Sequence, residues 1–334
     1  MINNFCVALY NLHQLVRPIE TLIMPKFVMP DLAALQALVF PIVPEDSMSE
    51  AGRKVLLTHF IDLLTHQETV ANDDLMWAAA QRLRNALRIF EPYYTQRALK
   101  PLLKGLRPTT RILNKLHQVD MRLKTVKGYQ TMQEGEGADT FLPILETLNT
   151  YRQDLSEDLL KWFGSKQYAR FLKGFARFVT TSGLGSITPK TATDPYQVRH
   201  VVPVLVHQQL AQVRAFDSHL DTLDAPLHAL WIQFKRMNAL LNVFGDNLGT
   251  SANEFLEESK VIEDHLSQIN PTDAPKRLSD RRLLSEEQIE ALGFYRQSLD
   301  EQREKLSAEF ADLWTRFNTR TVQRKLADAL LVTR

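Results

Sequence analysis

The stretches DLMWAAAQRLRNALRIF (residues 74–90) and HALWIQFKRMNALLNVF (residues 228–244) align with each other without a gap. In both stretches apolar residues recur three and four positions apart, which is the pattern of one face of an amphipathic helix. Identical residues at matched positions include Trp77 and Trp231, Arg82 and Arg236, and Phe90 and Phe244. The alignment therefore predicts two equivalent helices, one in each half of the chain.

A second pair of similar stretches follows later in each half. Residues 148–155 and residues 292–299 both read L-x-x-Y-R-Q-x-L. Unrelated amphipathic helices also share composition, but two matches in the same order that include Trp and Tyr favour an internal duplication. We therefore expect an all-α fold of two pseudo-symmetric helical bundles around a central basic groove.

The rest of the chain after residue 44 also has a helical pattern. Capping boxes predict helix starts at Ser47, with Glu50, and at Ser285, with Gln288. Residues 200–207 (HVVPVLVH) resemble a strand in composition, but Pro203 argues against a central strand and we expect a helix. Breaks rich in Gly, Pro and Thr divide the chain into an extension at 1–44, a first half at 45–180, a linker at 181–195 and a second half at 196–334.

Composition excludes several classes of protein. The 334 residues are 44% apolar, and 40 Lys and Arg against 39 Asp and Glu give a net charge of +1. Such a chain buries a large core and is not a uniformly basic nucleic-acid binder. Its one cysteine, Cys6, allows no internal disulfide and fits a reducing, cytoplasmic location. The apolar N-terminal run has the features of neither a signal peptide nor a membrane span.

Positive charge is nevertheless concentrated in two stripes. Residues 97–115 place basic side chains at steps of three or four, on the helical face opposite a row of leucines. Pro101 is compatible with the start of a helix and Pro108 is expected to kink it, so the charged face is expected to continue in two segments. A second stripe lies in residues 166–177, opposite Phe171 and Phe175. Solvated surface would account for either stripe alone, but the absence of matching acids favours a shared anion groove. The stripes consist of Arg97, Lys100, Lys104, Arg107, Arg111 and Lys115, and of Lys166, Arg170, Lys173 and Arg177.

Catalytic and metal-binding patterns are missing from the sequence. It contains no P-loop, no G-x-G-x-x-G after a strand and no G-x-S-x-G turn. No histidine occurs in an E-x-x-H or H-E-x-x-H pattern, and the pair His200 and His207 has no carboxylate partners. We expect no catalytic residue, no metal site and no cofactor, and the acids around Asp264 and Asp273 give little support to phosphohydrolase activity.

The aligned helices resemble a known family, the CHAD domain (conserved histidine α-helical domain). Residues 226–244 resemble its hallmark helix, H-x-L-R-[IV]-x-x-[KR]-R-[LM]-R-x-x-L-x-x-F. Residues 106–120 resemble L-R-x(5)-L-G-x-x-R-D-x-D, and residues 262–270 (IEDHLSQIN) resemble L-Q-D-x-L-G-x-L-N. The likeness extends over about residues 47–325. It implies two pseudo-symmetric helical bundles around a basic channel, with inorganic polyphosphate as the ligand.

The resemblance also reveals a loss of charge at the hallmark positions. The first hallmark helix has Asp74 in place of His, Trp77 in place of Arg and Gln81 in place of a basic residue. In the second helix, Trp231 and Asn238 stand at Arg positions. One possible result of this loss of charge is that the two tryptophans pack against each other and fill the former channel.

Two functional hypotheses follow. The first is a non-enzymatic module that binds polyphosphate or a similar polyanion. Such a module could be located at polyphosphate granules in the cytoplasm, and we do not expect nucleic acid as its ligand. The second is a diverged helical scaffold for protein association, including homo-oligomers formed through residues 1–44. The ligand-binding residues implied by the resemblance and the stripes are Arg82, Arg84, Arg88, Lys104, Arg107, Arg111, Arg170, Lys173, Arg177, His228, Lys235 and Arg236. For His228, a hydrogen-bonded position between helices is the alternative to ligand binding.

Overall fold

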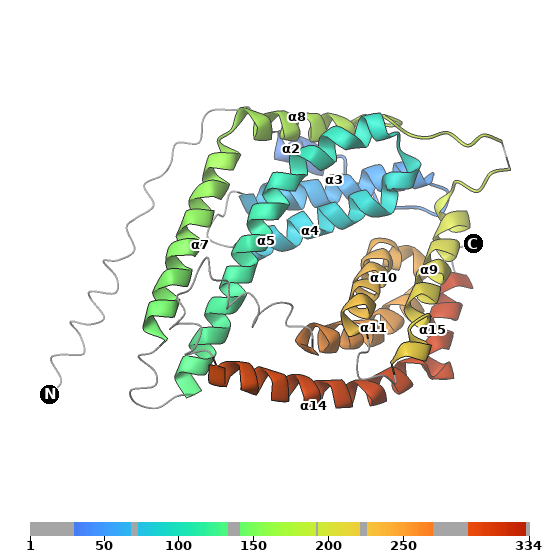
Figure 1. Cartoon of the computed structure of the whole chain (residues 1–334). Coiled ribbons are helices and arrows are strands. Elements are labelled where there is room, and N and C mark those ends of the chain that lie inside the picture. Colours follow the sequence, from blue (N-terminus) through green and yellow to red (C-terminus); the bar gives the residue numbers. More distant parts are fainter. Residues whose placement is uncertain are drawn as a thin grey trace.

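The fold of the described residues is entirely helical (Figure 1). The computed structural model describes residues 30–67, 73–132, 141–191, 193–220, 226–269 and 293–331. Two isolated β-bridges occur among these residues, and no strand. The helices are α2 (Leu32–Gln36), α3 (Met48–Gln67), α4 (Asp73–Phe90), α5 (Gln96–Met132), α7 (Leu142–Phe163), α8 (Lys166–Thr180), α9 (Val198–Arg214), α10 (Leu227–Leu248), α11 (Thr250–Ile269), α14 (Gly293–Phe317) and α15 (Arg320–Leu331), with short 3₁₀ turns at Glu91–Tyr93 and Asp217–His219. The all-α prediction is confirmed.

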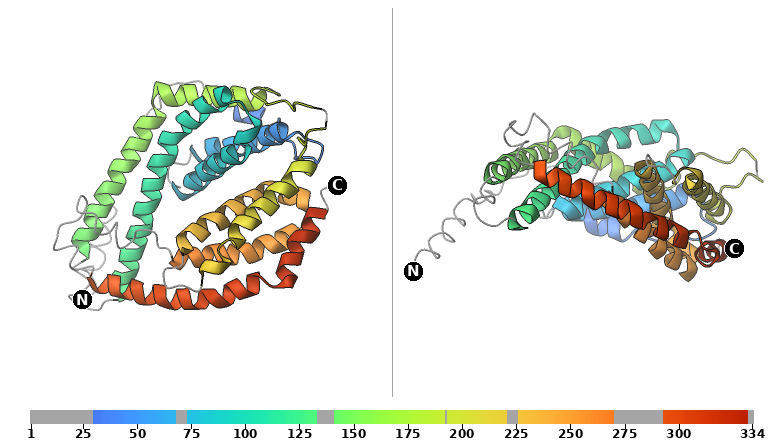
Figure 2. Two further views of the ribbon diagram at one scale, coloured as in Figure 1. Left: turned by 45° about the vertical axis from the view of Figure 1, so that its right-hand side comes forward. Right: turned by 60° about the horizontal axis from the view of Figure 1, so that its bottom comes forward.

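The helices pack in two groups that follow the order of the chain. Helices α3, α4, α5, α7 and α8 contact one another, and α9, α10, α11, α14 and α15 form the second group. The groups meet mainly where α4 packs on α10, with α3 against α9 as a smaller contact. Figure 2 shows α4 and α10 near the middle of the molecule, with α7, α8, α14 and α15 around the rim. The two predicted equivalent helices therefore form the join between the groups.

The predicted helix boundaries can be compared with the structure at several points. The backbone N–H of Glu50 donates to Ser47 Oγ at 3.1 Å, so the helix start predicted at Ser47 is confirmed. The second, at Ser285, lies outside the described residues. Residues 200–207 lie in α9, as predicted, with Pro203 inside the helix.

Pro101 does not open the helix at residues 97–115, because α5 already begins at Gln96. Helix α5 runs from residue 96 to residue 132 without interruption, and Pro101 and Pro108 both lie inside it. Each proline removes one backbone hydrogen bond. Packing on three neighbours, α4, α7 and α8, holds α5 helical through both positions.

The core of the first group depends on close contacts between helices. At the crossing of α5 and α8, a Cβ built on Gly105 would lie 2.4 Å from a ring atom of Phe171, so only glycine allows this approach. At the end of α7, the Trp162 Nε1–H donates to Thr109 Oγ1 of α5 at 2.8 Å. Tyr168 is buried and its hydroxyl donates to the buried Gln67 Oε1 at 2.7 Å. These contacts fix the position of α8 on α5 and α3.

Phe90 and Phe244, which are matched in the sequence alignment, meet at the join between the two groups. Their ring centroids are 5.8 Å apart with an interplanar angle of 63°, an edge-to-face contact. Both side chains are fully buried. The matched ends of α4 and α10 therefore pack directly on each other in the core.

The described part of the predicted extension also contacts both groups. The Lys54 Nζ, on α3, donates to the carbonyl of Pro41 at 2.8 Å, and the Asn247 Nδ2, on α10, donates to the carbonyl of Ile42 at 3.0 Å. The backbone N–H of Met48 donates to the carbonyl of Tyr196 at 2.8 Å. Within the described ranges, no helix has the length and apolar character needed to span a bilayer.

Candidate anion-binding surface

The substituted hallmark positions of α4 form a closed polar network with α5. The Trp77 indole stacks on the His117 ring, with centroids 3.8 Å apart and an interplanar angle of 6°. The His117 Nδ1 lies 3.1 Å from Asp74 Oδ1. The Trp77 Nε1–H donates to Asn114 Oδ1 at 2.8 Å, and the Gln81 side-chain amide donates to the same oxygen. These side chains therefore satisfy one another instead of facing an anion.

The arrangement excludes the expected contact between Trp77 and Trp231. Among the ring contacts of the described residues, Trp77 pairs with His117 and Trp231 with His228, at a centroid distance of 5.6 Å. Each indole therefore packs within its own group of helices. The polar partners on α5 hold Trp77 in place, which sequence reasoning missed because the pairing needs residues 37 positions apart.

Removing the shared acceptor should destabilise the protein. For Asn114→Ala we expect the free energy of unfolding to fall by about 1 to 2 kcal/mol, because the Trp77 and Gln81 donors lose their partner in a half-buried site. Urea titration followed by circular dichroism measures the change, with Gln118→Ala on the same helix as the control. Equal stability of the two variants would contradict the proposed role of the network.

The hallmark face of α10 has a different arrangement. The Lys235 ammonium lies over the Trp231 ring, 4.3 Å from its centroid, in a cation–π contact. Asn238 is 3% exposed, and its Nδ2 donates to Glu263 Oε2 on α11 at 2.7 Å. The Trp231 Nε1–H is buried and has no hydrogen-bond partner among the described residues. His228 and Arg236 are exposed on the same helix. The face keeps three basic or potentially basic side chains but also holds a carboxylate.

The three arginines of α4 differ in how their charge is balanced. Arg82 Nη2 lies 3.5 Å from Asp62 Oδ2, so its charge is partly balanced. Arg84 is half-buried and neither an ion pair nor a hydrogen bond joins its side chain to a described residue. Burial first, and then the charge of Arg88, lowers the pKa of Arg84 below its usual value. Because Arg84 is half-buried beside another guanidinium, its positive charge is the least balanced on α4.

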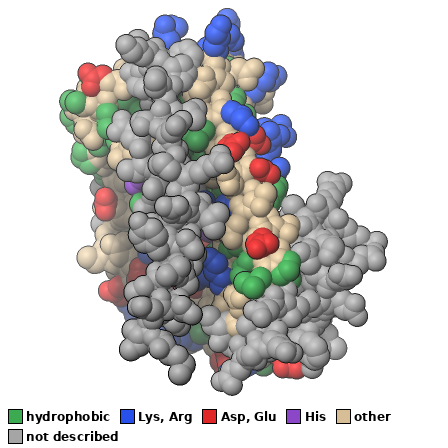
Figure 3. Space-filling view, turned by 90° about the vertical axis from the view of Figure 1, so that its left-hand side faces the viewer, with side chains coloured by type: hydrophobic (Ala, Val, Ile, Leu, Met, Phe, Trp, Pro, Cys, Tyr) green, Lys and Arg blue, Asp and Glu red, His purple; other side chains and the backbone are tan. Residues whose placement is uncertain are grey.

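The two predicted basic stripes are exposed, and within the described part of the chain none of their side chains forms an ion pair. Helices α5 and α8 share one core, so their stripes face solvent on the other side of both helices. At the crossing, Lys104 and Arg170 directly precede the contacting residues Gly105 and Phe171. Figure 3 shows Lys and Arg side chains gathered at the top of the molecule, where α8 lies. We call the stripes together the outer cation surface: Arg97, Lys100, Lys104, Arg107, Arg111, Lys115, Lys166, Arg170, Lys173 and Arg177.

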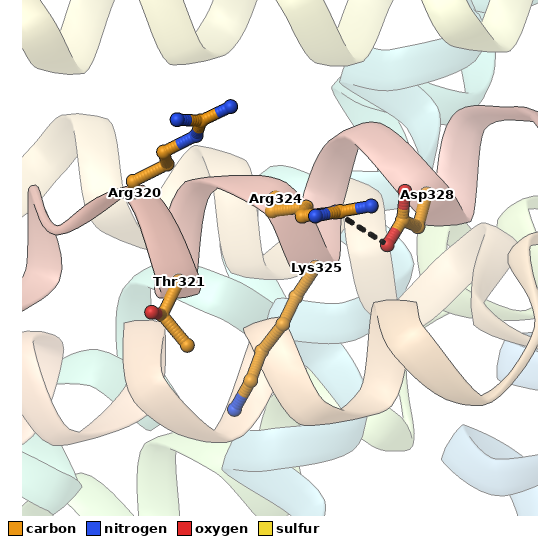
Figure 4. A pocket seen from close by; sticks show the side chains of 5 residues that line it. All are labelled: Arg320, Thr321, Arg324, Lys325 and Asp328. Atoms are coloured by element: carbon orange, nitrogen blue, oxygen red, sulfur yellow. Dashed lines mark ion pairs between the residues drawn. The ribbon is translucent and has the colours of Figure 1, made fainter.

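A separate hollow lies on α15, a helix for which no site was predicted. It has a volume of about 320 Å³ and is lined by Arg320, Thr321, Arg324, Lys325 and Asp328 (Figure 4). Arg324 Nε lies 3.7 Å from Asp328 Oδ2, and Lys325 Nζ lies 3.6 Å from Glu254 and Glu258 of α11. Acids therefore balance most of its charge. Among the described residues, no group of three His, Cys, Asp or Glu side chains is placed to hold a metal ion.

Comparison with known protein families identifies the fold. The family model of the CHAD domain matches residues 54–280, which include α4, α5, α8, α10 and α11. The chain belongs to the CHAD family. The resemblance found in the hallmark stretches is therefore confirmed. The likeness was expected to reach residue 325, but the match ends at residue 280, before α14.

Solved CHAD-type structures share the fold at low identity. The CHAD domain from the plant Ricinus communis is 15% identical, with a TM-score of 0.59 over 88% of this chain and 95% of that chain. PptA from Streptomyces chartreusis is 16% identical, with a TM-score of 0.54 over 81% of this chain and 100% of that chain. No curated protein matches the chain. At this identity the likeness establishes the CHAD fold.

Proposed function

We propose that this CHAD protein is a non-enzymatic module that binds inorganic polyphosphate or a similar linear polyanion. The observation that carries the proposal is the outer cation surface, whose side chains are exposed and without ion pairs in the described part of the chain. Like charges three and four residues apart on a helix repel one another by a few tenths of a kcal/mol per pair. An anion with repeated charges relieves this repulsion, and membership of the CHAD family supports polyphosphate as that anion.

The dimensions of the surface favour a polymer over a small anion. From Arg97 to Lys115 the α5 stripe extends about 27 Å at 1.5 Å per residue, and the α8 stripe crosses it. A single phosphate would neutralise one or two of these cations, whereas a chain can follow the row. Arg84 and Arg88 on α4 add a second group of cations. We propose a smaller role for Arg82, which is paired, and for His228, Lys235 and Arg236 on α10.

A filter-binding titration tests the proposal directly. Labelled long-chain polyphosphate is titrated with the full-length protein at low and at moderate salt. Binding at low salt that weakens steeply as salt is added is expected, because phosphate contacts release condensed counterions. A protein that retains no polyphosphate at low salt would contradict the proposed function.

The arginines of α4 provide a matched pair of variants. Arg84→Gln should weaken polyphosphate binding by about tenfold, the value of one charge-assisted contact to an oxyanion. Arg82→Gln removes the same charge two residues away, on nearly the opposite side of α4, from an arginine already paired with Asp62, and should change affinity by less than about twofold. Equal effects of the two variants in the filter assay would show that Arg84 has no special role.

The alternative function, a scaffold for protein association, is favoured by one observation. Leu38, Val39, Phe40 and Val43 are all exposed within one short segment, with Phe40 55% exposed. Clustered apolar side chains on a surface often mark contacts with another protein. If this segment mediates self-association, light scattering will detect a dimer or larger species that Val39→Ser with Phe40→Ser converts to a monomer. A wild-type protein that is monomeric at all concentrations would remove this alternative for homo-oligomers.

A further inference from the structure

Two contacting positions on α10 and α11 reduce the positive charge of the second hallmark face. Asn238 stands at a position that is Arg in the CHAD hallmark pattern, and Glu263 stands at the Gln position of the segment L-Q-D-x-L. One change removes a cation and the other adds an anion. Because the two side chains hydrogen-bond to each other, they form one unit in the structure.

The carboxylate of Glu263 is held firmly in this unit. Its Oε2 accepts from Asn238 Nδ2 at 2.7 Å, and the buried Ser259 hydroxyl donates in turn to Asn238 Oδ1. Asn238 is 3% exposed and Ser259 is fully buried, so neither has room to change its partner. The negative charge therefore stays close to the exposed face of α10.

The charges around Glu263 come from α10 and from its own helix. Burial, which is the largest influence, raises the pKa of Glu263, and Asp264 raises it further, whereas the Asn238 hydrogen bond, Lys235 and Lys260 act in the opposite direction. Lys260 also forms an ion pair with Glu257, in which Nζ lies 2.8 Å from Oε1. Lys235 has no ion-pair partner within 4 Å among the described residues, and it lies one turn before Asn238, which holds the Glu263 carboxylate.

We infer that Glu263 weakens anion binding at the hallmark face of α10, so that Lys235 holds a phosphate group strongly only when Glu263 is neutral. This inference rests on the proposed function and adds a residue that regulates one part of the surface. At neutral pH an incoming phosphate meets the ammonium of Lys235 together with a nearby carboxylate, and the two opposite charges largely cancel at the distance of the ligand.

The direction of the pH dependence follows from protonation. A carboxyl group with a raised pKa takes up its proton earlier during acidification than an exposed one. Acidification should therefore strengthen polyphosphate binding at α10. His228, which contacts Trp231, is a second titratable side chain on the same helix, so the wild-type pH profile alone does not identify the group responsible.

The isosteric variant Glu263→Gln separates the two groups. Its side-chain oxygen can still accept from Asn238, but its charge is absent at every pH. At neutral pH we expect Glu263→Gln to bind long-chain polyphosphate on the order of fivefold more tightly than wild type. The difference should disappear as the pH falls through the pKa of Glu263, because the wild-type carboxyl group is then neutral as well.

Two further variants complete the experiment. Glu254→Gln also removes one negative charge from α11, but from a residue that pairs with Lys325. It is the control for the change in net charge and should bind polyphosphate like wild type. Lys235→Met in the Glu263→Gln background should abolish the gain, because Glu263 acts through Lys235. Circular dichroism verifies that each variant is folded.

Every outcome of the titrations is decisive. Tighter binding by Glu263→Gln at neutral pH, lost with Lys235→Met, supports the inference. Wild type and Glu263→Gln that bind equally at all pH values overturn the inference and leave the proposed function in place. If Glu263→Gln binds and wild type does not, the inhibitory role is supported. If neither protein binds at any pH, both the proposed function and the inference fail.

Discussion

Polyphosphate binding should fall by about a hundredfold or more at low salt when Lys104, Arg107, Arg170 and Lys173 are all replaced by glutamine. These four residues lie within one turn of Gly105 or Phe171, which meet where α5 crosses α8. All four are exposed and none forms an ion pair with a described residue, so their replacement leaves no buried charge behind. The expected loss is therefore one of binding and not of folding.

The salt dependence gives a second, independent measure of the same variant. Each phosphate contact contributes about 0.7 to 0.9 to the slope of log affinity against log salt, so losing four contacts should lower the slope by about three. Filter binding at several salt concentrations measures it. The matched control replaces four exposed cations elsewhere, Arg214, Arg303, Lys305 and Arg320, with glutamine. If the control loses as much affinity and slope as the test variant, net charge alone determines binding and the outer cation surface is not the site.

Phe90→Ala should lower the free energy of unfolding by about 3 to 5 kcal/mol, the usual cost of removing a buried phenylalanine. Phe90 is fully buried between the two groups of helices, where its ring contacts Phe244. It also fills the space above Gly52, where a built Cβ would lie 2.8 Å from the ring. Since Gly52 has no side chain that could move into the gap, the cavity should remain open.

A double-mutant cycle with Phe244→Ala tests whether the contact itself joins the two groups. Urea titration of the single and double variants should give a coupling energy of about 0.5 to 1.5 kcal/mol, typical of an aromatic pair. Phe40→Ala, at a position 55% exposed, serves as the control and should have little effect. A loss below about 1 kcal/mol for Phe90→Ala would contradict the packing described at this join.

Local sequence patterns predicted the helices well because they depend on residues close in the chain. The spacing of apolar residues predicted α4 and α10, and the Ser47 capping box predicted the start of α3. Local rules are compatible with a helix start at Pro101, but α5 begins at Gln96 and continues through Pro101 and Pro108. Contacts with three other helices outweigh the loss of a backbone hydrogen bond there, and local sequence does not contain that information.

The candidate site was predictable only in part. Helical spacing placed the cations of α5 and α8 on one face of each helix, and both faces are exposed. It did not indicate that Arg82 is paired with Asp62 while Arg84 has neither an ion pair nor a hydrogen bond with a described residue. Nor did it suggest that His117 would stack on Trp77, because the two residues belong to different helices.

The sequence by itself determined the helices, the family and the rows of unbalanced positive charge, since each is set by residues within a few turns of one another. Only the tertiary structure decided which of these charges are balanced and which are open to a ligand. The packing of one helix on another allows Asp62 to pair with Arg82 and Asn114 to accept a hydrogen bond from Trp77. It also places Glu263 where Lys235 influences its pKa. Electrostatic and hydrogen-bond energies depend on distance through space, and the packing of helices sets that distance.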